Sequence, residues 1–74
     1  MLSIAAQQDR VNYLVTTHST ETLLRRAQRA NAVVDRVRRS EAGAHLVEAA
    51  IAHRSVLKWA WHEAAAADRR LQFA

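Results

Sequence analysis

The sequence predicts an all-α protein, and three observations support this. The 74 residues include no proline and a single glycine. Alanine, leucine, arginine, glutamine and glutamate, which lose little freedom on entering a helix, are abundant. The apolar residues recur at helical spacings of three and four. A chain this short can bury only a small hydrophobic core, which is marginally adequate to stabilise a fold. We therefore expect residues 1–74 to form one small helical domain, and we expect dimerisation to complete it as a helical bundle.

The first helix is predicted over about residues 3–15. Ile4 and Val11 share one side of it with Leu14 or Val15, at spacings of seven and of three to four. Ser3 is a candidate N-cap. Residues 13–17 are rich in β-branched side chains, so we expect this end to fray or turn.

The second helix is predicted over about residues 20–39, after a turn that contains Ser19. The Ser19 hydroxyl can cap free amides, and Glu21 lies near the positive end of the helix dipole. The helix is amphipathic, because one side carries a coiled-coil-like apolar seam. The seam consists of Leu23, Ala27, Ala30, Val34 and Val37.

A break is predicted at residues 40–43. Nine residues separate Val37 from Leu46, the start of the next apolar seam, and this spacing does not continue a helical phase. Ser40 and Glu41 suit a helix start. We therefore expect an antiparallel helical hairpin rather than one long helix.

The third helix is predicted over residues 44–72, about 44 Å against about 30 Å for the second helix. Residues from about Ala64 onward should extend past the second helix, and the first helix can fold across them. His53 falls on the seam, where a hydrogen-bonded core histidine is expected. The predicted seam consists of Leu46, Ala50, His53, Leu57, Ala60 or Trp61, Ala64 and Leu71.

Trp59 and Trp61 must point to different sides of this helix, because a two-residue separation turns a helix by about 200°. Trp61 falls beside the seam and is expected in the core. Trp59 falls on a second face that has no expected partner within the chain, so we predict a dimer or partner interface there. The predicted interface residues are Trp59, Ala52, Ala66, Val56 and Ala49.

Arginines line the polar side of the second helix and allow an alternative function. Arg25, Arg29, Arg36 and Arg39 form a stripe that could contact the phosphates of a nucleic acid, or remain a solvated face. Part of the arginine excess reflects GC-rich codons, which favours a high-GC bacterium or its phage as the source. Docking on an anionic membrane surface is a weaker alternative, because the apolar side of this helix has no aromatic residue.

The sequence gives little support for catalysis, metal binding or a cofactor. It has no cysteine, no HExxH motif and no glycine-rich phosphate loop, and its four histidines lack ligand spacing. No apolar run is long enough to span a membrane, so a cytoplasmic location is expected. We predict no enzyme activity, no metal and no cofactor.

The string over residues 48–59 resembles the ends of the helix-turn-helix in winged and excisionase-like DNA readers. The gap between its ends is about one helical turn too short, and the turn glycine is missing, so we predict a continuous helix. The preferred hypothesis is a small dimeric helical module that binds another protein as a regulator or inhibitor, as host-directed phage proteins do.

Overall fold

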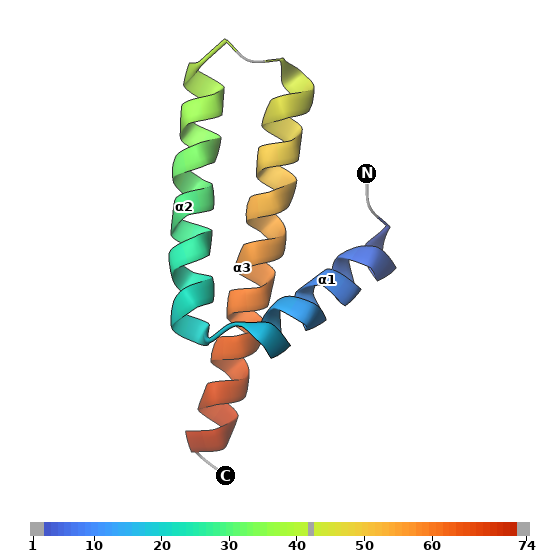
Figure 1. Ribbon diagram of the computed structural model, residues 1–74, viewed down its shortest axis with the longest axis vertical. Coiled ribbons are helices and arrows are strands. Elements are labelled where there is room, and N and C mark those ends of the chain that lie inside the picture. The colour runs from blue at the N-terminus through green and yellow to red at the C-terminus, as the bar shows by residue number, and fades with distance from the viewer. Residues whose placement is uncertain (1–2, 42, 73–74) are drawn as a thin grey trace.

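Three α-helices make up the computed structural model, which describes residues 3–41 and 43–72. They are α1 (Ile4–Thr17), α2 (Thr20–Arg39) and α3 (Ala44–Gln72) (Figure 1). The described residues contain no strand, so the predicted all-α class is confirmed. None of the described helices is long and apolar enough to cross a membrane.

Helix α1 begins at its predicted cap and ends later than the sequence suggested. The Ser3 hydroxyl accepts a hydrogen bond from the Ala6 amide at 3.1 Å. The expectation of a frayed end is wrong, because α1 continues to Thr17. The Thr16 and Thr17 hydroxyls donate to the Tyr13 carbonyl at 2.9 and 2.7 Å, a local bond that β-branched threonine makes in a helical rotamer.

Helix α2 has the cap and the apolar seam that its sequence predicts. The Ser19 hydroxyl accepts from the Thr22 amide at 3.2 Å. Along the seam, Val37 is half-buried and the other members are buried, namely Leu23, Ala27, Ala30 and Val34.

The predicted break between the two long helices is present. Helix α2 ends at Arg39, and the Gly43 carbonyl accepts bonds from the Leu46 and Val47 amides at 3.0 and 3.3 Å, which starts α3. Ala42 of the predicted turn lies outside the described residues. The chain reverses direction here, so α2 and α3 run antiparallel (Figure 1).

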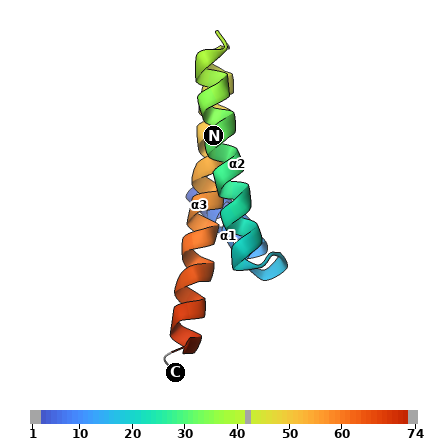
Figure 2. The ribbon, with the colours of Figure 1, turned by 90° about the vertical axis from the view of Figure 1, so that its left-hand side faces the viewer.

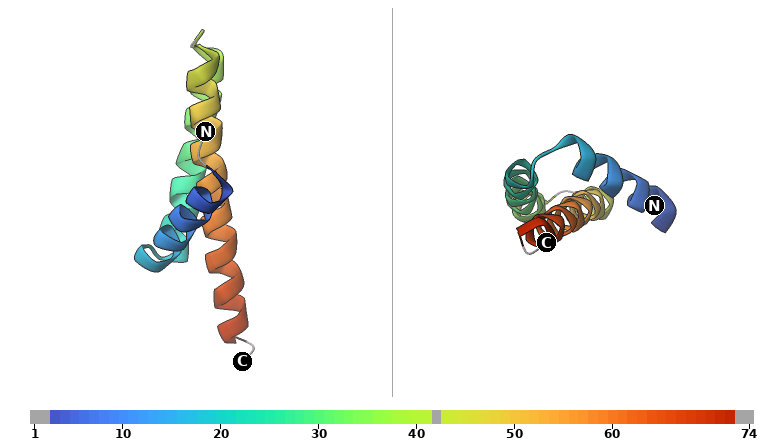
Figure 3. Two further views of the ribbon diagram at one scale, coloured as in Figure 1. Left: turned by 90° about the vertical axis from the view of Figure 1, so that its right-hand side faces the viewer. Right: turned by 90° about the horizontal axis from the view of Figure 1, so that it is seen from below.

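Helix α3 is the central element, because α2 and α1 pack on different sides of it. The view along the long axis shows this arrangement (Figure 3). All three helices contribute to one core. The cluster consists of Val11 and Leu14 from α1, Leu23, Ala27 and Ala30 from α2, and Val56, Leu57, Ala60 and Ala64 from α3.

The molecule is elongated and thin. Its extents are 49 × 24 × 16 Å, and its radius of gyration is 13.8 Å, against about 11 Å for a compact chain of this length. Figure 2 shows the thin edge. The exposed area is 5603 Å², against about 4,600 Å² for a compact monomer of this mass. The chain therefore leaves about 1,000 Å² more surface exposed than a compact domain would.

Three members of the predicted α3 seam are exposed rather than buried. Leu71 is 78% exposed, because α3 extends past the start of α2 (Figure 1). Leu46 is 52% exposed near the hairpin turn. His53 is also exposed, so the prediction of a core histidine is wrong. It lies across a groove from Ala30, whose small side chain cannot cover the imidazole.

Candidate interaction surfaces

The five residues predicted to form an interface on α3 lie in different environments. Ala49 and Ala52 are exposed, and Ala66 is half-buried. Val56 is buried, with 6% of its surface exposed. Trp59 is half-buried and packs against the core. The expectation that this face has no partner within its own chain is therefore wrong for Val56 and only partly right for Trp59.

The cause is the position of α1. Val11 and Leu14 of α1 belong to the same core cluster as Val56, so α1 packs against the middle of α3. The sequence suggested that α1 could instead cover the end of α3, beyond Ala64. Val56 is therefore covered, and the part of α3 that stays exposed begins later, at residues 68–72.

Four residues nevertheless lie on one side of α3, which we call the Trp59 face: Ala49, Ala52, Trp59 and Ala66. Its alanines present little side chain, so another helix could approach closely. Trp59 adds a large ring that is only half covered by its own chain. A small-residue strip around one tryptophan resembles the centre of a helix–helix interface.

The four arginines of the predicted stripe are all exposed on α2. Among the described residues, one carboxylate pairs with an arginine: Glu21 with Arg25, at 3.6 Å. Arg39 donates from Nε to the Asp35 backbone carbonyl at 3.3 Å, and the Asp35 carboxylate forms no ion pair within the described residues. Most of the arginine charge on α2 is therefore free to meet a partner.

The charge is also concentrated. Helix α2 holds six arginines and two carboxylates, so its formal charge of +4 equals that of the whole chain. The rest of the molecule is neutral on balance. A partner with negative charge would therefore be attracted to α2.

A groove that the sequence analysis did not identify lies between α2 and α3. It encloses about 240 Å³, and we call it the basic groove. It is lined by Arg26, Arg29, Ala30 and Val33 of α2 and by His53 and Leu57 of α3. The seven-residue spacing of Arg26 and Val33 was visible in the sequence. The sequence did not show that His53 lies opposite Arg26 and Val33, because this depends on the register between the two helices.

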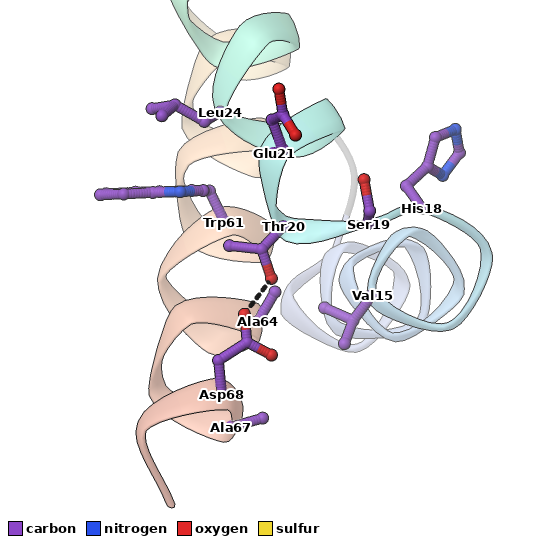
Figure 4. A pocket seen from close by; sticks show the side chains of 10 residues that line it. All are labelled: Val15, His18, Ser19, Thr20, Glu21, Leu24, Trp61, Ala64, Ala67 and Asp68. Carbon is purple, nitrogen blue, oxygen red and sulfur yellow. Dashed lines mark hydrogen bonds between the residues drawn. The ribbon is translucent and has the colours of Figure 1, made fainter. Parts of the chain in front are cut away.

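A second, wider depression lies where the chain enters α2 (Figure 4). The Thr20 hydroxyl donates to the Asp68 carboxylate at 2.6 Å and ties the start of α2 to α3. Trp61 lies along the same depression. It was expected in the core, but it is half-buried and packs against the core from its edge, as Trp59 does. The Trp61 and His62 rings are 4.8 Å apart between centroids.

The described residues hold no group of three or more histidine, aspartate or glutamate side chains placed to bind a metal ion. The string over residues 48–59 lies within the uninterrupted α3, so it forms no helix-turn-helix. Comparison with family models, with curated proteins and with solved structures finds no match for this chain. The interaction surfaces must therefore be interpreted from their own chemistry.

Proposed function

We propose that this protein is a small helical interaction module that forms a homodimer and binds another protein as a regulator or inhibitor. The observation that carries the proposal is the excess of about 1,000 Å² of exposed surface. A standard protein–protein interface covers about 800 Å² on each partner. The excess is therefore close to what one subunit would bury in a stable dimer.

The Trp59 face is the part of this surface best suited to self-association. Two-fold dimers pair the same patch on both subunits, and this face lacks the concentrated arginine charge of α2. Its alanines allow two α3 helices to approach closely, while Trp59 provides apolar area at the centre of the contact. Val56 lies beneath the face and supports it from the core.

The dimer is tested by placing a charge in the middle of this face. Ala52→Glu adds a carboxylate at an exposed position of α3, where glutamate preserves helix propensity. Ala32→Glu is the matched control, because Ala32 is an exposed alanine of α2. We expect sedimentation equilibrium to give a dimer for the wild type and for Ala32→Glu, and a monomer for Ala52→Glu. A monomeric wild type, or a dimer unaffected by Ala52→Glu, would refute the proposal.

A nucleic-acid-binding regulator is the second candidate, and the concentration of the net charge on α2 favours it. An exposed arginine stripe can neutralise phosphates, and such binding weakens steeply as salt rises. The test compares the wild type with a variant in which Arg25, Arg29 and Arg36 are changed to Gln, by mobility shift at two salt concentrations. Absence of a shift by the wild type at low salt would remove this candidate.

A further inference from the structure

We propose that the basic groove binds an acidic amphipathic helix from the partner protein. This inference rests on the proposed function, because it assigns the partner-binding site and the chemistry of the partner. Three observations support it: exposed apolar side chains along the groove, unpaired positive charge on its rim, and the adjacent packing of α1.

A strip of α3 residues runs beside the groove through His53, Val56 and Ala60, at spacings of three and four. Its second half is covered, since Val56 and Ala60 are buried in the cluster that includes α1. Its first half is bare, since His53 is exposed. The strip therefore continues past the place where α1 packs, which leaves room for one more helix.

Apolar side chains on both long helices border the bare half. Val33 of α2 is 44% exposed and Leu46 of α3 is 52% exposed, while Ala30 and Leu57 form the buried floor of the groove. An amphipathic helix covers such a surface with residues at i, i+3 or i+4, and i+7. The distance along α3 from Leu46 to Leu57 is about 17 Å, so a segment of about three turns would fill it.

The positive charge beside the groove indicates that the bound helix is acidic. Arg26 and Arg29 stand on the α2 rim, both are exposed, and no carboxylate lines the groove. Neither arginine forms an ion pair within the described residues. A helix with glutamate or aspartate beside its apolar stripe would place negative charge against this rim.

The same features argue against two other occupants. A second copy of this chain that offered its own groove or its α2 would bring arginine against arginine. A nucleic acid would satisfy Arg26 and Arg29 but leave Val33 and Leu46 exposed, because a phosphate backbone has no apolar surface to cover them. An acidic amphipathic helix meets both the charge and the apolar area.

The experiment is an NMR titration of the isotope-labelled full chain with synthetic helical peptides of about three turns. The first peptide has leucines at i, i+4 and i+7 flanked by glutamates, and the second has lysines in place of those glutamates. We expect saturable shifts at Val33, His53 and Leu57 with the glutamate peptide alone. A duplex oligonucleotide forms a third arm, and binding of the duplex at these residues without binding of the glutamate peptide would overturn the inference.

Two variants show whether the groove itself is responsible. Changing Arg26 and Arg29 to Gln should weaken peptide binding about fivefold, as expected for two partly screened charge pairs. Changing Arg69 and Arg70 to Gln removes the same charge from exposed positions at the end of α3 and should leave binding unchanged. Equal weakening by both pairs would show non-specific charge attraction and refute the site.

A conservative change tests the apolar part. Val33→Thr keeps the shape of the side chain but replaces a methyl group with a hydroxyl, so binding should weaken about threefold. Sedimentation of the same samples reports the dimer independently. Absence of peptide binding at the groove by a dimeric wild type refutes this inference alone, whereas groove binding by a monomeric wild type refutes the dimer alone.

Discussion

Val56→Ala tests the most consequential feature of the fold, the burial of Val56 under α1. The valine is 6% exposed, so truncation removes two buried methyl-sized groups, a loss of about 1.6 kcal/mol in transfer free energy. The cavity left behind adds to this loss, and the better helix propensity of alanine returns about 0.5 kcal/mol. We expect the free energy of unfolding to fall by about 1.5–2 kcal/mol, which lowers Tm by about 6–15 °C in a chain of this size.

The assay is urea and thermal unfolding followed by circular dichroism, at low and at high protein concentration. Val33→Ala is the matched control, because the same truncation at a residue that is 44% exposed should cost less than about 0.5 kcal/mol. A double-mutant cycle with Val11→Ala should show coupling of at least about 0.5 kcal/mol between the two sites. If Val56 instead belonged to the dimer interface, its truncation would weaken the dimer and the Val11 coupling would vanish, which would refute the packing described here.

Two further predictions concern the local structure. Ser19→Ala removes the acceptor for the Thr22 amide and should lower the free energy of unfolding by about 1 kcal/mol, whereas Ser19→Asp should retain the cap. Equal stability of the wild type and both variants in urea would contradict this prediction. Leu57 and Leu71 lie on the same helix but are 3% and 78% exposed. In the same unfolding assay, Leu57→Ala should lower the free energy of unfolding by about 3 kcal/mol, and Leu71→Ala should lower it by less than about 0.5 kcal/mol. Similar losses from both leucines would show that the end of α3 is covered in solution.

Local chemistry made much of the fold predictable. The Ser19 cap, the seam from Leu23 to Val37 and the phase break before Leu46 all depend on residues within a few helical turns of one another. The hydrogen bonds and the buried residues of α2, and the hydrogen bonds at the start of α3, agree with each of these predictions. The end of α1 differs from its prediction, because the Thr16 and Thr17 hydroxyls bond to the Tyr13 carbonyl and offset the low helix propensity of β-branched residues.

Packing between helices was less predictable, because it depends on register and on where α1 lies. Helical phase placed Trp59 and Trp61 on different sides of α3, but it could not show that both would be half-buried and pack against the core, or that α1 covers Val56. For the same reason His53 was assigned to the core. A position on the seam is buried only if the facing side chain is large enough to reach it, and Ala30 is not.

The way α3 is surrounded links the two proposed surfaces. Helix α2 covers one side of α3 and α1 covers part of a second, so one molecule presents two unfinished faces. The Trp59 face has alanines and a tryptophan without a dominant charge, whereas the basic groove has apolar residues beside two unpaired arginines. A single partner chemistry cannot suit both faces. Self-association through the neutral face would still leave the basic groove available, so a dimer would present two sites for an acidic helix and could gain avidity for a partner that carries two such segments.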